Sequence, residues 1–303
     1  MSHNVPVSGT APWFTVFTAT YNRAHTLRRV YESLLSQTMQ DFEWLIVDDG
    51  STDNTEARVG EMVAEGRLPI RYIKKPNGGV HTAQNVAIRQ ARGKLFLRLD
   101  SDDACVPQAL ETLREKWLEI PENLRDQYSG VSCLCMHPSG ETVGGMYPAY
   151  QWDSDYAVLE PLRGEKWGFH RSDLLREHPF PEFTGEGFCP EGLVWARLHD
   201  KYKTRCFNIP LRIYFSSNDS ITSSMTRTRY RSPKGMALYY NEQMHRLGTL
   251  RALRHAVNYI RFSPANDGVW RALHNATRKG LVLLALPLGW ALHVRDRQRG
   301  DYV

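Results

Sequence analysis

Paired cysteines are missing from this sequence of 303 residues. Its five cysteines are scattered, and no Cys-x-x-Cys pair is present to bind zinc. Cys133 and Cys135 are expected on one face of the same strand, where they cannot form an ordinary disulfide. We therefore expect reduced cysteines and a cytoplasmic protein.

Targeting segments and long apolar runs are also missing. The first twelve residues have neither a basic start nor an apolar stretch, so they do not resemble a signal peptide. The longest apolar run, 281–294, is shorter than an ordinary transmembrane helix and contains Pro287. No internal repeat is present. The length allows one large domain with an appendage, or two small domains.

The net charge of +5 hides an asymmetry along the chain. Residues 225–303 contain 14 Lys and Arg against 4 Asp and Glu, whereas the rest contains 24 against 29. A basic segment attracts anionic lipid or nucleic acid, but it can also be a solvated face of terminal helices. Because nothing here resembles a nucleic-acid recognition module, we expect no nucleic-acid partner.

Apolar periodicity predicts alternating strands and helices in the first third of the chain. Strands are expected at 14–19, 42–47, 70–73 and 95–99, with helices at 26–37, at 52–65, up to residue 91 and after Pro107. This order predicts an α/β fold with a mostly parallel sheet between helices. Further strands at 131–136, 205–209 and 212–215 and a helix at 192–202 predict an extension of the same domain. The expected division is a catalytic domain at 1–220 and a basic helical extension at 221–303.

Three carboxylates, Asp100, Asp102 and Asp103, follow the fourth predicted strand within four residues. They repel one another unless a cation lies among them, and hard oxygen ligands suit Mg²⁺ or Mn²⁺. Magnesium sites combine one or two carboxylates with substrate phosphates, which predicts a diphosphate ligand. The alternative is that Asp102 or Asp103 only caps the following helix.

A second acidic pair, Asp48 and Asp49, leaves the second predicted strand just before Gly50. Carboxylates at this point can accept hydrogen bonds from a base or a ribose. A turn followed by a helix cap would explain Gly50 and the residues after it, but not two adjacent carboxylates. Since ligands of parallel sheets bind at the carboxyl ends of the strands, we expect both acidic clusters at one edge.

Ordered sequence blocks resemble the family 2 glycosyltransferases. They are TATYNR at 18–23, SLLSQT at 33–38, VDDGSTD at 47–53, NGGVHTAQN at 77–85 and LDSDD at 99–103. The resemblance is close over about 12–110, the expected donor half, and extends loosely to about residue 215. The expected acceptor half is about 130–220. The resemblance implies a GT-A fold and an enzyme that moves a sugar, with inversion, from a nucleotide-diphospho-sugar to a hydroxyl acceptor. We expect uridine diphosphate (UDP) as the nucleotide.

The resemblance also implies roles for individual residues. Thr18 and Asp49 match positions that contact the base and its surroundings, and Asp100 matches the ribose-side carboxylate. Asp102 matches the ligand of a Mn²⁺ or Mg²⁺ ion that bridges to the diphosphate. Further donor-site candidates are Tyr21, Asn22, Arg23, Asp48 and His81; an exposed Arg or His there can equally be incidental.

The catalytic base in this family usually lies in a Glu-Asp pair before a helix, and that pair is absent here. Glu191 takes the place of the Glu and is the first candidate, with Glu186 as the second. Glu191 can instead complement the dipole of the following helix. Lys166 and Trp167 are candidates for contact with the acceptor, or packing residues on a strand.

The apolar run 281–294, which contains Trp290 and has arginines on both sides, suits a helix in a membrane interface or a buried terminal helix. The expected acceptor is a saccharide or lipid-linked saccharide, used in surface polysaccharide or glycolipid biosynthesis at the inner face of the cell membrane. Two other functions stay open. A sugar nucleotidyltransferase would need a glycine-rich phosphate loop, which 18–23 lacks, and a non-catalytic member would bind nucleotide sugar or membrane only.

Overall fold

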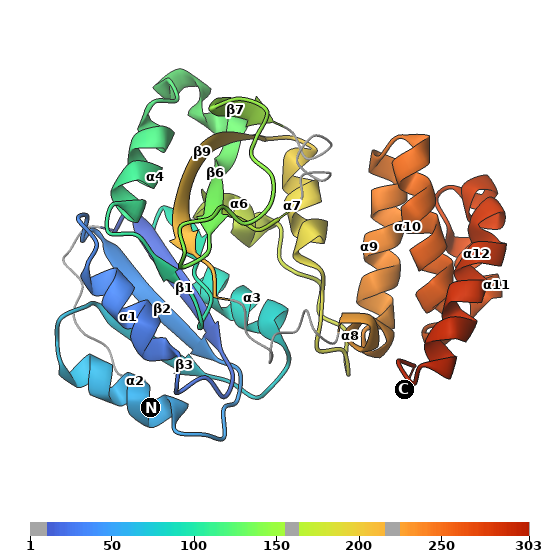
Figure 1. Ribbon diagram of the computed structural model, residues 1–303, viewed down its shortest axis with the longest axis horizontal. Helices are drawn as coiled ribbons and strands as arrows, with labels where there is room; N and C mark the ends of the chain where they lie inside the picture. The colour runs from blue at the N-terminus through green and yellow to red at the C-terminus, as the bar shows by residue number, and fades with distance from the viewer. Residues whose placement is uncertain (1–10, 155–163, 216–224, 303) are drawn as a thin grey trace. The chain divides into compact units, whose positions relative to one another are not determined.

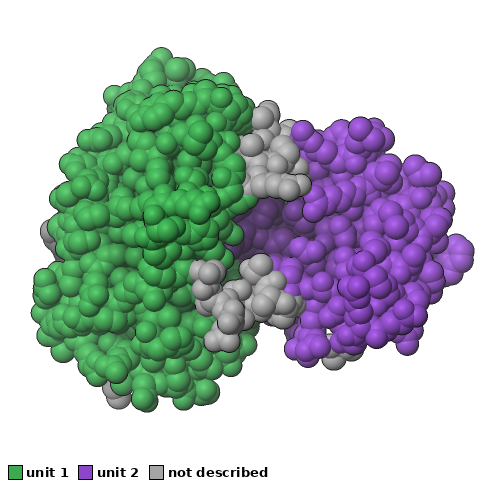
Figure 2. Space-filling model, in the orientation of Figure 1, with its two compact units in different colours: residues 1–179, 197–217 green, residues 180–196, 218–303 purple. Residues whose placement is uncertain are grey.

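The computed structural model describes residues 11–154, 164–215 and 225–302 (Figure 1). The chain divides into two compact units (Figure 2). Unit 1 comprises residues 1–179 and 197–217, and unit 2 comprises residues 180–196 and 218–303. Most of the amino-terminal segment discussed above, and the expected domain boundary at residue 220, lie outside the described ranges.

The described residues of unit 1 form a nine-stranded mixed sheet in the order β3-β2-β1-β4-β8-β6-β9-β5, with β7 paired to β9. The strands β3, β2, β1 and β4 are parallel neighbours, as the sequence predicts. β8 runs antiparallel between β4 and β6. The strands are β1 (Phe14–Thr20), β2 (Phe42–Asp48), β3 (Ile70–Lys74), β4 (Leu95–Arg98), β5 (Ala104–Cys105), β6 (Tyr128–Met136), β7 (Gln151–Ser154), β8 (Lys166–Arg171) and β9 (Lys203–Ile213).

The strand order decides which face each helix covers. From β1 to β3 the chain steps in one direction, and from β3 to β4 it returns past β1. Because such crossovers are right-handed, α1 (Leu27–Leu35) and α2 (Thr55–Ala64) cover one face and α3 (Val80–Gln90) covers the other. Side chains alternate accordingly: Phe14 and Val16 join the core beneath α1, α2 and α4 (Ala109–Leu118), while Phe17 lies on the α3 side.

Several element boundaries differ from the predicted ones because of tertiary contacts. α2 begins at Thr55 instead of residue 52, since the Asn22 side chain accepts hydrogen bonds from the backbone of Thr52 (2.8 Å) and Asp53 (3.3 Å) and holds them in a loop. One strand, β9, replaces the two predicted at 205–209 and 212–215. Its Pro210 lies where the register with β6 shifts, which accommodates the missing donor.

The described part of unit 2 is mostly helical. Its C-terminal helices are α8 (Met225–Arg231), α9 (Pro233–Arg246), α10 (Thr249–Phe262), α11 (Val269–Asn275) and α12 (Lys279–Gln298). α10 and α12 approach closely because Gly289 has no side chain; an added Cβ would lie 2.7 Å from Ile260. The buried Asp296 accepts hydrogen bonds from Arg261 and from the Tyr230 hydroxyl (3.0 Å), which ties α8, α10 and α12 together.

Residues 180–196 group with the C-terminal helices, whereas the sequence placed them in the catalytic domain. The Glu186 carboxylate accepts hydrogen bonds from the backbone N–H groups of Lys234 (2.7 Å) and Gly235 (2.9 Å) in the first turn of α9. These N–H groups have no partner within the helix. A partner so far away in sequence is not visible in local patterns. Among the described residues, no helix combines the length and the apolar content needed to cross a membrane.

Candidate functional site

The strand order of unit 1 reverses between β1 and β4, and the acidic clusters follow the carboxyl ends of the parallel strands there. Such a reversal leaves a crevice in which α/β proteins bind ligands. Asp48 ends β2, opposite Thr20 at the end of β1. The loop of Asp100, Asp102 and Asp103 follows β4 directly. The structure thus brings together, at one edge, the two clusters that the sequence placed there.

Arginine side chains balance the charge of the acidic loop. Arg98 Nε donates to Asp100 (2.7 Å), and Arg212, on β9, donates to Asp100 (2.5 Å) and Asp103 (2.6 Å). The backbone N–H of Phe215 donates to the other oxygen of Asp103 (2.9 Å). Two of the three carboxylates therefore receive positive charge from within the fold, without a divalent cation, from Arg212, which lies more than 100 residues away in sequence. No local signal in the sequence identifies it.

The ion pairs set the protonation of the two paired carboxylates. Burial by itself would raise the pKa of Asp100, but the guanidinium groups of Arg98 and Arg212 outweigh it and lower the pKa to about 2. Asp103 is more deeply enclosed, and burial raises its pKa to about 6 although Arg212 opposes the change. Asp100 is thus ionised at neutral pH, with 27% of its side chain exposed at the edge.

The loop at residues 75–79 is organised around Asp49. The Asp49 carboxylate, 4% exposed, accepts hydrogen bonds from Lys75 Nζ (2.5 Å), from the backbone N–H groups of Gly78 (3.0 Å) and Gly79 (2.7 Å), and from the Asn77 amide (3.2 Å). The second acidic cluster therefore fixes the entry to α3. Sequence reasoning missed Lys75, although it lies only two residues before the motif at 77–85.

Asp48 and Thr18 lie beneath the edge. Asp48 is fully buried and accepts hydrogen bonds from the Ser51 backbone (2.7 Å) and the Tyr72 hydroxyl (2.5 Å). The Thr18 hydroxyl donates to the Leu99 carbonyl (2.8 Å) and accepts from the Trp44 indole (3.0 Å), also with no exposure. The prediction that both side chains contact the nucleotide is corrected: they support the strand ends.

The last three residues of the block at 18–23 form a loop directly after β1. Asn22 has a positive φ of 54°, which asparagine tolerates better than most residues. Its backbone N–H donates to Ser51 (2.9 Å), and the Arg23 N–H donates to Thr55 (3.2 Å), which joins this loop to the one after β2. Tyr21 is 50% exposed. The Asn22 side chain is thus part of the scaffold, whereas Tyr21 remains accessible.

Two buried polar groups near this edge were missed by the sequence analysis. The Thr20 hydroxyl and both polar atoms of the Gln84 amide are buried, and they have no hydrogen-bond partner among the described residues. Thr20 ends β1, and Gln84 lies on α3 beside Ala83 in the motif at 77–85. Buried polar groups ordinarily have partners, so these groups are candidates for contact with a ligand. His81, on the first turn of α3, is 2% exposed.

The acceptor candidates belong to the sheet. Trp167 is 4% exposed within the core, and its indole donates to the Arg98 carbonyl (2.5 Å). Of the two roles left open for Trp167, the structure favours packing on a strand, because its ring packs inside unit 1. Lys166 donates to the Gly145 carbonyl (2.8 Å), and burial lowers the pKa of its ammonium group.

The two candidates for the base lie in unit 2. Glu191 is the first residue of α7 (Glu191–His199) and is half-buried. Glu186 uses both carboxylate oxygens to bind the first turn of α9. The structure therefore gives Glu186 a structural role, and Glu191 stays the better candidate.

The residues at the acidic edge fit a metal ion that is bound jointly by one carboxylate and by the phosphates of a substrate. Among the described residues, no group of three or more His, Cys, Asp or Glu side chains is arranged to hold a metal ion. Asp102 is half-buried, between two carboxylates that are paired with Arg212. One carboxylate with substrate phosphates is an arrangement that Mg²⁺ uses.

Comparison with known proteins identifies the family. Residues 15–128 match the family described as Glycosyl transferase family 2. The chain belongs to glycosyl transferase family 2. It is 38% identical to chondroitin synthase of Pasteurella multocida over 109 residues, which are 36% of this chain and 11% of that protein. It is 33% identical to the uncharacterized glycosyltransferase YibD of Escherichia coli over 219 residues, 67% of this chain and 61% of that one.

The chain therefore spans about a tenth of the chondroitin synthase and less than two thirds of YibD. Two solved structures resemble the family 2 chain described here. S. aureus TarS 1–349 in complex with UDP-GlcNAc has a TM-score of 0.59 at 18% identity, covering 95% of this chain and 92% of that one. The mannosyltransferase PcManGT from Pyrobaculum calidifontis, with GDP-Man and Mn²⁺, has a TM-score of 0.55 at 17% identity, covering 97% and 85%. The predicted GT-A fold is confirmed.

Proposed function

We propose that this chain transfers a sugar from a nucleotide-diphospho-sugar to a hydroxyl acceptor in polysaccharide or glycolipid assembly. The observation that carries the proposal is the pairing of the acidic loop with Arg98 and Arg212 at the reversal point of a family 2 sheet. Asp100 is held ionised there for the ribose side of the donor. Tyr21, Asp49, Arg23 and His81 complete the proposed surroundings of the nucleotide.

Asp102 is the residue we propose for Mn²⁺ or Mg²⁺. Its neighbours Asp100 and Asp103 are paired with Arg98 and Arg212, so a divalent ion would be shared by Asp102 and the donor diphosphate. When bound, the ion stabilises the negative charge that develops on the departing diphosphate. The PcManGT structure, which contains Mn²⁺ and GDP-Man, supports this choice, and the UDP-GlcNAc complex of TarS supports UDP as the nucleotide.

Glu191 is the proposed general base. In a single inverting displacement, the acceptor oxygen forms a bond to the anomeric carbon while the bond to the diphosphate oxygen breaks. The bonding electrons leave with the diphosphate, and the hydroxyl proton passes to the Glu191 carboxylate. Two features support the assignment: Glu191 takes the sequence position of the Glu in the family's usual pair, and it begins α7.

Nucleotide binding tests the donor site. We expect UDP with Mn²⁺ to stabilise the wild-type protein in thermal unfolding, and Asp102→Asn to abolish the metal-dependent part. Asp126→Asn is the matched control, because its side chain is 98% exposed at another edge of unit 1. Equal stabilisation of wild type and Asp102→Asn would reject Asp102 as the metal ligand. Stabilisation by guanosine diphosphate alone would reject UDP.

Transfer assays test the base and the alternative functions. We expect Glu191→Gln to keep donor binding and to lower the transfer rate by 10²–10⁴-fold, the range of general base catalysis. Glu177→Gln, on the exposed surface of α6 (Ser172–Glu177), is the control. Unchanged transfer in Glu191→Gln would exclude Glu191. Donor binding without transfer in the wild type would favour the non-catalytic alternative, and formation of a nucleotide sugar from a sugar phosphate would favour the nucleotidyltransferase.

We further propose that α12 lies on an anionic membrane surface. Its exposed side carries Leu283 (58% exposed), Leu284 (70%), Leu288 (57%) and Trp290 (47%). The cations of this helix lie at its two ends, and its one acidic residue, Asp296, is 1% exposed and paired with Arg261. An apolar face bounded by cations, with no exposed acid, suits the interface of a bilayer with anionic lipid. This location would bring the enzyme to a lipid-linked acceptor.

Vesicle binding tests the membrane proposal. We expect binding to vesicles with 30% phosphatidylglycerol, weakened by salt and by Leu284→Ser/Leu288→Ser about tenfold, and little binding to pure phosphatidylcholine. Leu250→Ser is the control, since Leu250 is 88% exposed on α10. Equal binding by the double variant and wild type would reject α12 as the contact. Salt-independent self-association through the same leucines would replace the membrane with a second copy of the chain.

A further inference from the structure

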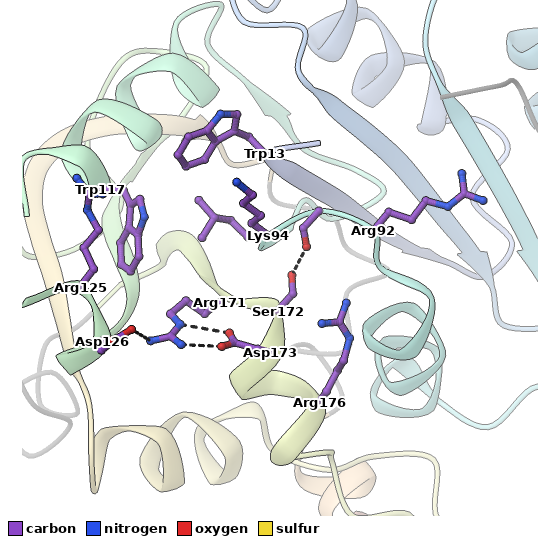
Figure 3. Close-up of a pocket in the computed structure, with 12 residues that line it drawn as sticks. Trp13, Arg92, Lys94, Trp117, Arg125, Asp126, Arg171, Ser172, Asp173 and Arg176 are labelled. Atoms are coloured by element: carbon purple, nitrogen blue, oxygen red, sulfur yellow. Dashed lines mark hydrogen bonds and ion pairs between the residues drawn. The ribbon is translucent and has the colours of Figure 1, made fainter. Parts of the chain in front are cut away.

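A cavity in unit 1 lies at the amino ends of β1 and β4, at the edge opposite the acidic loop (Figure 3). Its volume is about 500 Å³, within the range of sites that bind small ligands. Trp13, just before β1, and Leu95, the first residue of β4, are among its lining residues. Leu95 and Asp100 are separated by the length of the strand, about 16 Å at 3.3 Å per residue. The cavity is therefore distinct from the proposed donor site.

The lining of this cavity has more positive charge than its own carboxylates neutralise. Arg171 engages both acids: it donates to Asp173 (2.6 Å) and lies 3.5 Å from Asp126. The four other cations are Arg92, Lys94, Arg125 and Arg176. Within the described ranges, none of these four has a carboxylate partner. The cavity thus favours a ligand with negative charge.

Two of these cations are positioned by the backbone. Arg125 Nε donates to the Ile120 carbonyl (3.0 Å), and Arg176 donates to the Ala91 carbonyl (2.7 Å). A carbonyl holds a guanidinium in place without removing its charge, and its remaining N–H groups can reach a ligand. Figure 3 shows Arg92 extending away from the tryptophans, whereas Arg125 and Arg176 lie on opposite sides of Lys94. We therefore assign Lys94, Arg125 and Arg176 to the anionic groups of a ligand that extends along the cavity.

Aromatic surface accompanies these cations. The Lys94 ammonium lies 5.3 Å from the centre of the Trp13 ring, and Trp13 is half-buried. Trp117 is 7% exposed and packs edge-on against Phe169. A bare phosphate would leave the indole of Trp13 unused and most of the volume unfilled. A ligand with both an apolar face and an anionic group would use both features of the lining.

We propose that this cavity binds acidic sugar units of a glycan chain, through Lys94, Arg125 and Arg176 for their anionic groups and Trp13 for the apolar face of a sugar ring. The choice of a glycan as the ligand rests on the proposed transferase function. The positive charge and the aromatic surface of the cavity are observed independently of that function. Such a site would hold an acidic acceptor or product chain away from the reacting end. A chain of several sugars would be long enough to pass from this edge to the other.

Direct binding tests the proposal without turnover. The probes are a galacturonate hexasaccharide, a neutral maltohexaose of the same length, and inorganic phosphate, titrated calorimetrically into the full chain. We expect the acidic hexasaccharide to bind at least tenfold more tightly than the neutral one. We also expect Lys94→Glu/Arg176→Glu to weaken acidic binding at least tenfold.

The control variant is Arg58→Glu/Arg67→Glu, which makes the same change in charge at exposed positions of α2 and the turn after it. Metal-dependent UDP stabilisation in each variant reports the fold and the donor site separately. The proposal would be overturned if the control variant weakened binding of the acidic hexasaccharide as much as Lys94→Glu/Arg176→Glu does. It would also be overturned if the neutral hexasaccharide, or inorganic phosphate, bound as tightly as the acidic one. If UDP stabilisation fails while acidic binding holds, the donor-site proposal alone is wrong.

For Lys94→Ala alone, which removes one exposed ammonium group without reversing charge, we expect a threefold or larger weakening. This single substitution keeps the test valid if the double variant does not fold. Unchanged binding of the acidic hexasaccharide in Lys94→Ala would remove Lys94 from the site and overturn the assignment.

Discussion

The two edges of the sheet in unit 1 differ in how their charges are balanced. At the carboxyl edge, acidic residues predominate, but Asp49, Asp100 and Asp103 each have a cation within ion-pair distance. At the amino edge, cations predominate, and four of the five around the cavity lack a carboxylate partner among the described residues. The sign of a charge therefore does not show whether a residue stabilises the fold or can bind a ligand. Whether the residue has an oppositely charged partner is more informative.

Burial explains the difference in pairing. Asp103 and Arg212 have 1% and 8% of their side chains exposed, so each would be an uncompensated buried charge without the other. Arg92, Lys94 and Arg176 are exposed, and water can solvate them. The fold tolerates unpaired cations at the amino edge for this reason. The following predictions test the comparison.

The largest expected effect is at Arg212. Arg212→Gln removes the cation shared by Asp100 and Asp103, and we expect the unfolding free energy of unit 1 to fall by about 3–5 kcal/mol. Urea unfolding followed by the fluorescence of the buried tryptophans measures it. The matched change at the other edge, Arg176→Gln, is expected to alter stability by less than about 0.5 kcal/mol. Similar losses of unfolding free energy in both variants would show that the two edges do not differ in how much the fold depends on their cations.

An intermediate effect is expected in the middle of the sheet. His170, on β8, pairs with Phe96 of β4 and Gly130 of β6, and burial with the nearby His199 ring lowers its pKa to about 3. The unfolded chain binds this proton below its ordinary pKa of about 6.5, whereas the folded chain does not. Stability contributed by neutral His170 is therefore lost as the pH falls below 6.5, by about 2 kcal/mol at pH 5.

Unfolding measured at pH 7 and pH 5 checks this prediction. His170→Gln cannot titrate, so we expect it to lose about 2 kcal/mol less than the wild type over this interval. If both proteins lose the same stability, His170 is protonated in the folded state and the centre of the sheet accepts a charge as readily as its edges do.

The smallest expected effect is at Lys94. Because its ammonium group is exposed and its recorded partner is the Trp13 ring, we expect Lys94→Ala to change the unfolding free energy by about 0.5 kcal/mol or less. Thermal or urea unfolding of the unliganded protein measures this. A loss of several kcal/mol would show that Lys94 is part of the fold, and the amino edge would then resemble the carboxyl edge.

Much of the donor half was predictable because its signals are local. The parallel strands β1 to β4 follow from apolar runs and their spacing, and the positions of Asp49 and Asp100 at the strand ends follow from the strand order. The acceptor half was less predictable. β8 inserts between β4 and β6 although it is distant in sequence from β4, and Trp167 enters the core with it. No local periodicity reports which strand will be its neighbour.

The sequence by itself determined the family, the alternation of strands and helices, and the acidic residues at the strand ends, because these depend on side-chain periodicity and turn chemistry over a few residues. Only the tertiary structure decided that Arg212 pairs with Asp100 and Asp103, that Glu186 binds the start of α9, and that the amino edge has a cavity whose cations mostly lack a carboxylate partner among the described residues. The physical reason is that pairing and burial depend on which distant segments the fold brings into contact.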